Sequence, residues 1–348
     1  MEGRVVVLGQ WKGREAAALI VDGLLEDLLI EPRAELADIP QPGAILRGIV
    51  DRPMKGQGGV FVKLPGTTGF LRQVSGLTPG QRVIVQVSGT AEAGKALPLT
   101  LRVLFKSRLC ILTPGAPGIN ISRRIREDDV REDLQSLATE AMQGAPRDLG
   151  LIIRSAAAEA DDAEIADEIM QTRDLAIAVM GDVEGQPELL VDGAGPHELA
   201  WREWSDPRPD EIAEGETAFE DHGVLEMIDE LCEPEVALPG GGSMVIEPTR
   251  ALIAVDINTG NDTSPAAGLK ANIAAARDLP RQLRLRGLGG QVTIDFAPVP
   301  KKDRGTLEQV LRAAFKGEAA ETTLAGWTPL GCFEAQRKRD RLSLEDLL

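Results

Sequence analysis

The chain has 348 residues, of which 43% are hydrophobic, and that length is long for one hydrophobic core, so two or more domains are expected. Its net charge of −17 argues at first against a polyanionic partner, and its isolated cysteines, Cys110, Cys232 and Cys332, exclude a disulfide framework or a closed zinc site within one chain. No basic-then-apolar leader opens the chain and no run of 18 apolar residues occurs, so we expect a cytoplasmic protein.

The first predicted elements are short β-strands. Residues 4–8 and 16–21 are β-rich runs, and Asp22-Gly23 gives a hairpin turn signal before Leu24. Five further strand candidates, punctuated by glycine and proline, follow at 44–50, 59–63, 68–71, 82–87 and 97–104. Their number and spacing predict a small Greek-key barrel of the OB type.

The next part of the chain alternates helix and strand signals. A helical stretch over 127–142 precedes an apolar run at 150–153 that ends in Arg154 and Ser155. Another helix is expected over 161–180. Its buried stripe is predicted to contain Ile165, Ile169 and Met170.

The acidic residues are concentrated in the middle of the chain. Residues 155–256 carry 27 Asp and Glu but only 4 Lys and Arg, whereas both flanks are mildly basic. The acidic segment is either a solvating face or a docking surface for a basic partner. The basic clusters at 123–126 and 337–341 either contact a polyanion or form solvated faces.

Two apolar runs of strand length, 251–260 and 289–296, each contain an aspartate near their C-terminal end. The segment between them has helical spacing and ends near Gly287, which predicts a strand–helix–strand unit. A right-handed crossover would make the strands parallel and bring Asp256, Asn258 and Asp295 together at one edge of the sheet. Carboxylate and amide oxygens suit magnesium. The alternative is that each aspartate only caps a turn.

These residues also carry a family resemblance. Leu238-Pro239-Gly240-Gly241-Gly242-Ser243, Asp256-Ile257-Asn258-Thr259-Gly260, the run 281–290 and Ile294-Asp295-Phe296 resemble, in order and spacing, the catalytic core of bacterial ribonuclease E/G. The resemblance implies a magnesium-dependent endoribonuclease that cleaves single-stranded RNA in RNA processing or decay and leaves 5′-phosphate and 3′-hydroxyl ends. It implies that Asp256 and Asp295 hold the Mg²⁺ and that Asn258 steadies the site.

The same resemblance implies three sets of RNA contacts. Phe61 and Phe70 would stack on RNA bases, although they could instead be core residues of the barrel. Lys95 would lie near the phosphate backbone or be an ordinary surface lysine. Arg154 and Ser155 would recognise the 5′-terminal phosphate, because arginine offers a bidentate fork and serine a hydroxyl donor; the alternative is a structural arginine at a strand end.

The architecture implied is α/β and multi-domain. A discontinuous RNase H-like platform would comprise residues 1–38 and 186–235, the second part being abbreviated. The OB-fold barrel would span 39–110, a 5′-sensor segment 111–185, and a DNase I-like catalytic domain 236–348.

Several departures from the family pattern keep other functions open. Pro298 occupies a position where the family usually has a further acidic residue, the loop after Asn258 is shorter, and Pro280 interrupts the crossover helix. The cysteine pair that links subunits through zinc in longer members does not occur in this sequence, so we expect any homo-oligomer to form without a zinc link. The alternatives are a non-catalytic RNA-binding adaptor and, with less support, a nuclease acting on DNA.

Overall fold

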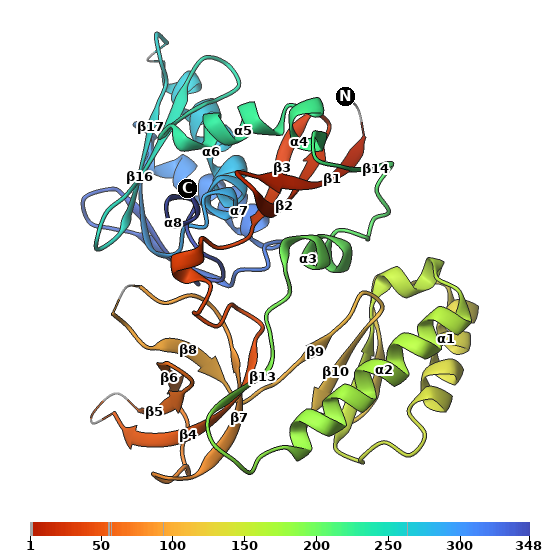
Figure 1. The fold of residues 1–348 in the computed structure, drawn as a ribbon. Helices are drawn as coiled ribbons and strands as arrows, with labels where there is room; N and C mark the ends of the chain where they lie inside the picture. The colour runs from red at the N-terminus through yellow and green to blue at the C-terminus, as the bar shows by residue number, and fades with distance from the viewer. Residues whose placement is uncertain (1–2, 55, 57, 93, 263) are drawn as a thin grey trace. The chain divides into compact units, whose positions relative to one another are not determined.

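The computed structural model describes residues 3–54, 56, 58–92, 94–262 and 264–348. The chain forms two compact units (Figure 1). The first comprises Met1–Gly23 and Leu29–Glu214, and the second comprises Leu24–Leu28 and Gly215–Leu348. Among the described residues, no helix combines the length and the apolarity needed to cross a membrane.

The N-terminal strands of the first unit form a small sheet. β1 (Arg4–Trp11) pairs antiparallel with β2 (Arg14–Val21) and parallel with β14 (Glu211–Glu214). The predicted hairpin turn is confirmed, since Asp22 and Gly23 both have positive φ, 50° and 78°, as a two-residue hairpin requires. β3 (Leu24–Ile30) follows that turn.

The predicted barrel of the OB type is confirmed as a closed sheet of five strands. The strands run in the order β4-β5-β6-β8-β7, and β7 pairs back onto β4. They are β4 (Ile45–Pro53), β5 (Gly59–Leu64), β6 (Thr67–Arg72), β7 (Arg82–Val87) and β8 (Leu97–Thr100). Alternate residues such as Val60, Val62 and Leu71 fill the barrel core.

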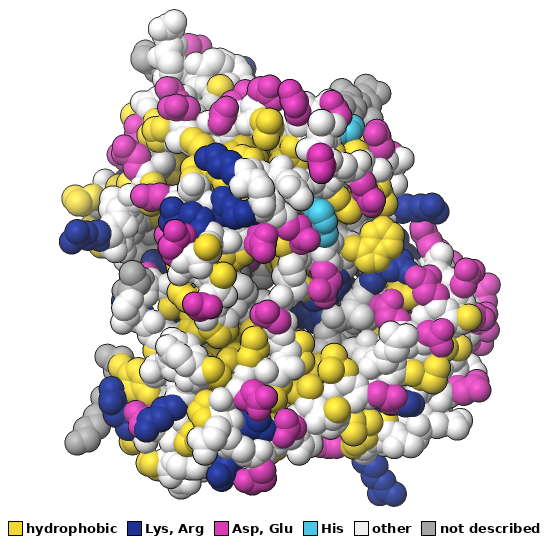
Figure 2. Space-filling view, viewed as in Figure 1, with side chains coloured by type: hydrophobic (Ala, Val, Ile, Leu, Met, Phe, Trp, Pro, Cys, Tyr) yellow, Lys and Arg dark blue, Asp and Glu magenta, His cyan; other side chains and the backbone are white. Residues whose placement is uncertain are grey.

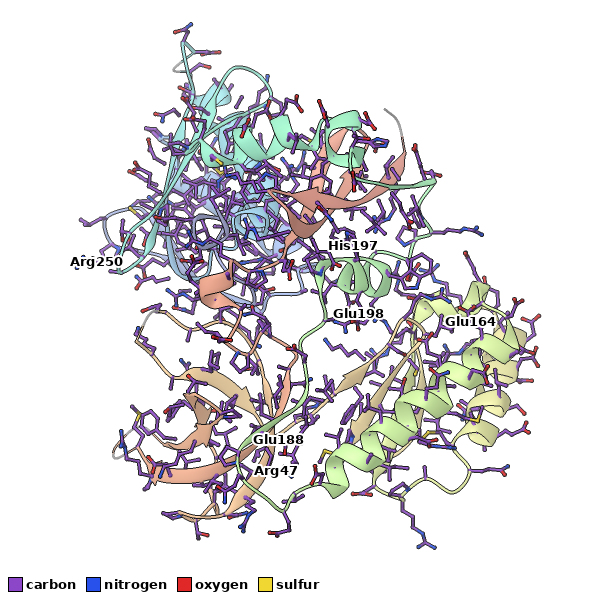
Figure 3. The ribbon with its side chains drawn as sticks, viewed as in Figure 1. Arg47, Glu164, Glu188, His197, Glu198 and Arg250 are labelled. Carbon is purple, nitrogen blue, oxygen red and sulfur yellow. The ribbon has the colours of Figure 1, made fainter. Side chains whose placement is uncertain are left out.

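A sixth strand that the sequence did not indicate, β13 (Glu188–Val191), pairs antiparallel with residues 45–47 at the start of β4. Arg47 on β4 is almost completely buried and pairs with Asp182 and Glu188, whose side chain Figure 3 shows close to that of Arg47. Arg47 also donates to the carbonyl oxygens of Glu184 and Gln186. This arginine therefore fastens the returning chain to the barrel.

A third sheet in the first unit carries the segment that ends at Arg154. Its order is β11-β12-β10-β9, and two helices pack on it. The elements are β9 (Phe105–Lys106), β10 (Cys110–Pro114), β11 (Ile119–Ile121), α1 (Asp128–Ala141), β12 (Leu149–Ile153), the 3₁₀ turn η2 (Ser155–Glu159) and α2 (Asp162–Gly181). Figure 2 shows Asp and Glu side chains gathered over α1 and α2.

The prediction for the α2 stripe was partly wrong. Ile165 and Ile169 are buried as expected, but Met170 is 36% exposed. Met170 is a neighbour of Ile169 in the sequence, and successive helical residues point about 100° apart. The buried positions instead continue through Thr172 and Ala176.

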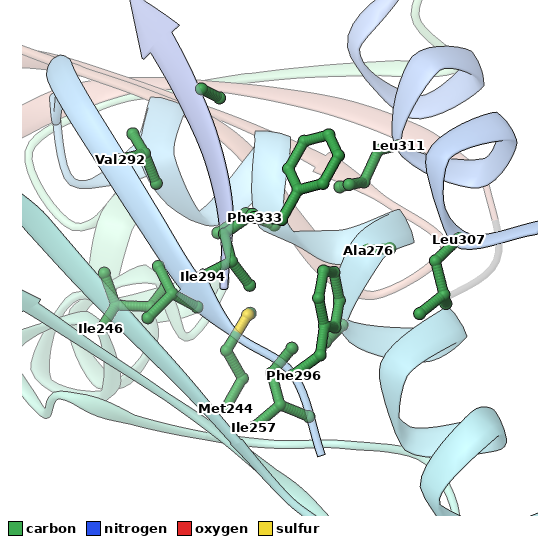
Figure 4. Close-up of a cluster of buried hydrophobic side chains, with 14 of the residues drawn as sticks. Met244, Ile246, Ile257, Ala276, Val292, Ile294, Phe296, Leu307, Leu311 and Phe333 are labelled. Atoms are coloured by element: carbon green, nitrogen blue, oxygen red, sulfur yellow. The ribbon is translucent and has the colours of Figure 1, made fainter. Parts of the chain in front are cut away.

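The second unit is built on a six-stranded sheet of order β15-β16-β17-β18-β20-β19. Residues from α6 (Pro265–Leu285) and α7 (Arg304–Phe315) pack with alternate strand residues in one core (Figure 4). The strands are β15 (Glu235–Ala237), β16 (Ser243–Pro248), β17 (Ile253–Asn258), β18 (Gly290–Asp295), β19 (Thr322–Trp327) and β20 (Phe333–Arg337). Pro280 lies inside α6 without ending it.

The remaining helical segments are short and lie between these elements. They are η1 (Ala34–Leu36), α3 (Pro196–Glu203), α4 (Ala218–Asp221), α5 (Val224–Cys232), η3 (Lys301–Asp303) and α8 (Leu344–Leu347). In the first unit, α3 packs Ala200 against Ala17 and Leu19 of β2.

Candidate functional site

Strand register places the two candidate metal ligands side by side. β17 and β18 are parallel, and Asp256 is the direct partner of Asp295. Directly paired residues of neighbouring strands point to the same face of a sheet. Both aspartates are exposed, whereas Val255 and Ile294 beside them are buried in the core. The expected parallel strand–helix–strand unit is confirmed, and its two carboxylates share the open face of the sheet.

Asn258 lies on the same face, two residues beyond Asp256. Its Nδ2 donates a hydrogen bond of 2.8 Å to Oδ2 of Asp256. This contact fixes the orientation of the carboxylate and leaves the amide oxygen of Asn258 available as a further oxygen donor. The sequence-predicted trio is therefore brought together.

The turn before β16 needs glycine because its backbone lies very close to the end of β17. A Cβ on Gly242 would lie 2.5 Å from the carbonyl oxygen of Asn258. Gly260 has φ +69°, and its Cβ would lie 2.3 Å from the carbonyl oxygen of Gly241. Side chains at either position would push the two loops apart. The turn therefore supports the backbone that carries Asn258.

Asn272, which the sequence analysis missed, holds the backbone just after Asp295. This α6 residue is fully buried. Its Nδ2 donates to the carbonyl oxygen of Ala297 at 2.9 Å, and its Oδ1 accepts from the amide of Ala297 at 3.0 Å. One amide side chain thus satisfies both polar groups of a buried peptide unit and fixes the exit of β18.

The donor set matches a hard divalent cation. Within the residues that the structure describes, no group of three or more His, Cys, Asp or Glu side chains is arranged to hold a metal ion. A site made of two carboxylates and an amide oxygen leaves several coordination positions to water and substrate, which is the mode that Mg²⁺ favours. The residues at this face therefore fit magnesium better than zinc, which prefers nitrogen and sulfur ligands.

Phe61 and Phe70 form a pair on the barrel wall. They are direct cross-strand partners on β5 and β6, and their ring centroids are 5.1 Å apart. Both are half-buried, and they alternate with the core residues Val60, Val62 and Leu71. The pair therefore lies outside the barrel core.

Two cationic side chains of the barrel contact neighbouring side chains, one an aromatic ring and the other a carboxylate. The guanidinium carbon of Arg52 lies 5.0 Å from the ring centroid of Phe61. Lys95, which is 67% exposed, forms an ion pair with Glu92. These positions leave the charge of Lys95 accessible to solvent.

Arg154 and Ser155 are already engaged by carboxylates. Nη2 of Arg154 contacts Oε2 of Glu203 at 2.7 Å, and its Nη1 donates to the carbonyl oxygen of Ser107. Ser155 Oγ hydrogen-bonds to Asp206, which also pairs with Arg124 at 3.0 Å. Both members of the candidate 5′-phosphate pair are therefore hydrogen-bonded to carboxylates of the same unit.

The pKa of Glu203 reflects this pairing. Burial acts to raise it, but the charges and hydrogen bonds of Arg154 and Arg202 prevail and lower it. Glu203 is therefore ionised at neutral pH and forms an ion pair with Arg154.

Two arginines of the basic cluster at 337–341 form intramolecular ion pairs, in contrast to both alternatives predicted from the sequence, whereas Lys338 of the same cluster is exposed. The side chain of Arg337 is 1% exposed and pairs with Glu318 at 2.8 Å. Arg341 pairs with Asp27 at 2.6 Å. Strand alternation explains the error, because Arg337 continues the buried positions Phe333 and Ala335 of β20.

The sequence of this chain is similar to those of known proteins. The Ribonuclease E/G family pattern matches residues 105–214 and 209–340. The chain is 28% identical to ribonuclease E of Synechocystis sp. over 96% of this chain and 56% of that protein, and 28% identical to ribonuclease E of Nostoc sp. over 88% and 52%. It is 28% identical to ribonuclease G of Escherichia coli over 95% of this chain and 79% of that protein. The chain thus spans about half the length of the two ribonuclease E relatives.

Proposed function

This chain belongs to the ribonuclease E/G family, and from that premise we propose that it is a magnesium-dependent endoribonuclease acting on single-stranded RNA. The observation that supports the proposal most is the direct pairing of Asp256 with Asp295 on an open sheet face. Its products would carry 5′-phosphate and 3′-hydroxyl ends, and its role would lie in RNA processing or decay.

Two residues of this face would bind the cation, and two other residues would hold them in position. Asp256 and Asp295 would hold the cation, and Asn258 would keep Asp256 oriented through its 2.8 Å hydrogen bond. When bound, magnesium supplies a water of lowered pKa as a nucleophile and neutralises phosphate charge. Asn272 would keep Asp295 in place from behind by holding Ala297.

The barrel and the third sheet would bind the RNA strand. Phe61 and Phe70 present adjacent rings outside the barrel core, and stacking on such rings is tolerant of base identity. Lys95 would contact the backbone. At the 5′ end, a phosphate would take over Arg154 and Ser155 from Glu203 and Asp206, so recognition is an exchange of one anion for another.

A non-catalytic RNA-binding adaptor is the second candidate. Pro298 stands where the family usually has another acidic residue. Among the residues that the structure describes, no third carboxylate is grouped with Asp256 and Asp295 at the candidate metal face. An adaptor would bind the same RNA through the barrel without cutting it.

One experiment separates the two. The purified chain is incubated with a 5′-monophosphorylated, AU-rich RNA oligonucleotide with and without magnesium, beside the Asp256→Asn variant. Cleavage that needs both magnesium and Asp256, with product ends that a ligase accepts as 5′-phosphate and 3′-hydroxyl, is the expected result. Binding without cleavage under all conditions would support the adaptor.

A further inference from the structure

A pocket in the first unit shares Ser155 and Asp206 with the candidate 5′-phosphate site, and its other lining residues have no role in the proposal above. Its volume is about 570 Å³, within the range of small-molecule sites. Val6, Leu8 and Trp204 supply apolar wall, and Ser155 and Asp206 line it on the side of the candidate phosphate site. Ser155 therefore belongs to both the pocket and the phosphate-binding pair.

Trp201 is the exposed aromatic surface of this pocket. Its side chain is 52% exposed, whereas Trp204, three residues later, is 5% exposed and packs in the core with Val6 and Ala17. The core tryptophan anchors the end of α3, so Trp201 is presented from a fixed support. An indole that is exposed to this extent at a pocket wall offers a flat surface on which a planar ligand group can stack.

Arg108 supports the orientation of that indole. Its guanidinium carbon is 5.5 Å from the ring centroid of Trp201, and its side chain is itself held by Glu164. This arrangement restrains Trp201 before any ligand arrives, which lowers the entropy cost of stacking.

The polar groups of the pocket carry both signs. Arg108 and Arg208 offer donors, and four carboxylates, those of Glu159, Asp206, Asp210 and Glu211, offer acceptors. A ligand with one strong charge would meet a like charge in this wall. The edge of a nucleobase, which carries donors and acceptors together with a planar apolar face, matches the mixture.

We propose that this pocket binds the base of the 5′-terminal nucleotide of the RNA. The inference rests on the proposed 5′-phosphate recognition by Arg154 and Ser155 and extends it to the nucleoside. The phosphate would sit on Arg154 and Ser155, and the base would stack on Trp201. The 5′ end is then recognised as a whole nucleotide and not only as a charge.

The test is equilibrium binding of fluorescently labelled RNA oligonucleotides to the full chain without magnesium, so that no cleavage intervenes. Three ligands are compared: 5′-monophosphorylated RNA, the same RNA with an abasic first nucleotide, and the 5′-hydroxyl form. The proteins are the unmodified chain, Trp201→Ala, Trp201→Phe and, as a control that removes an exposed apolar side chain of α2, Leu175→Ala.

Loss of the first base should weaken binding to the unmodified chain about ten-fold, the scale of one stacked base. Trp201→Ala should lose the same factor with the complete 5′-phosphorylated RNA and become insensitive to removal of the base. Trp201→Phe, which retains a stacking ring, and Leu175→Ala should both keep the base effect.

Equal binding of the complete and abasic 5′-phosphorylated RNAs by the unmodified chain would overturn the inference. Failure of the underlying 5′-phosphate recognition has a different signature, because the 5′-phosphorylated and 5′-hydroxyl RNAs would then bind alike. A base effect that persists in Trp201→Ala would also overturn the assignment of the pocket.

Discussion

The two candidate sites differ in whether their charged side chains are paired with opposite charges. One is the open face of β17 and β18, and the other is the segment around Arg154. Asp256 and Asp295 are exposed, and among the described residues no Lys or Arg forms an ion pair with either. Arg154, in contrast, is paired with Glu203, and neighbouring Ser155 with Asp206. The first site keeps its negative charge uncompensated, whereas the second supplies its own counter-anion.

This difference separates two tasks. Two neighbouring carboxylates without a cationic partner repel each other, and a divalent cation would relieve that repulsion, so the proposed metal site would bind its cation tightly. A phosphate that reaches Arg154 must replace a carboxylate already there. The net gain of the proposed phosphate contact would then be smaller, as expected for a contact that adjusts the cleavage rate of some RNAs without being needed for all of them.

The largest expected effect comes from neutralising the open face. Asp256→Asn or Asp295→Asn should reduce cleavage by roughly 100-fold or more, because a neutral amide is a weak ligand for a hard cation. Glu247→Gln, an exposed carboxylate on β16, is the matched control and should leave the rate nearly unchanged. Single-turnover cleavage at saturating RNA measures the effect, and thermal unfolding should be unaltered. Normal turnover in either aspartate variant would remove this metal site from the mechanism.

The support behind the open face should matter for stability as well as for rate. Asn272→Ala strands the amide and carbonyl of Ala297 inside the protein, and each unsatisfied buried group costs about 1–3 kcal/mol. We expect a loss of about 2–4 kcal/mol in the free energy of unfolding, together with slower cleavage. Denaturant unfolding measures it, with the exposed Asn258→Ala as a control that should retain stability. Unchanged stability in the Asn272 variant would refute the proposed clamp.

At the second site, removal of the arginine should affect only phosphorylated substrates. Arg154→Ala should slow cleavage of 5′-monophosphorylated RNA about ten-fold, toward the rate on 5′-hydroxyl RNA, because a charge-assisted contact is lost. Arg147→Ala, an exposed arginine outside the basic clusters that precedes β12, is the control. If both substrates slow equally in Arg154→Ala, the arginine is structural.

The smallest effect should have the opposite sign. Glu203→Gln removes the charge of the competing carboxylate, so 5′-monophosphorylated RNA should bind about three-fold to five-fold more tightly, the scale of one partly exposed ion pair. Glu132→Gln on α1 changes the same charge elsewhere and should not reproduce the gain. Weaker binding in Glu203→Gln would mean that Glu203 orients Arg154 and does not compete for it.

The sequence predicted the first site better than the second for a physical reason. Asp256 and Asp295 end two strands joined by one helix, so alternation and crossover handedness were enough to place them together. Glu203 comes about 50 residues after Arg154, at the end of a short helix, and no periodic signal links the two. The sequence could therefore name Arg154 but not its partner.

Other misses have similar causes. Asn272 lies in helix α6, whose apolar periodicity predicts its buried neighbours but gives no sign of a polar role for Asn272 itself. Its two hydrogen bonds go to a loop 25 residues away. Arg337 looked solvated because charged runs usually are, yet strand alternation places it inside. The domain boundaries, the roles of Lys95 and Ser155, the identity of the metal and assembly without zinc stay predictions, since strand pairing and packing do not test them.

The parallel pairing of β1 with β14 has a consequence for how the chain is made. Strand β1 begins at Arg4, and the amide of Arg4 is held by Asp210, 206 residues later. At about 5–20 residues per second, a ribosome needs roughly 10–40 s to synthesise the missing neighbour. Throughout that interval the outer edge of β1 has no strand to pair with, and unpaired edges invite association with other chains. Conditions that slow translation should therefore lower the yield of folded protein, even though the stability of the folded protein at equilibrium is unchanged.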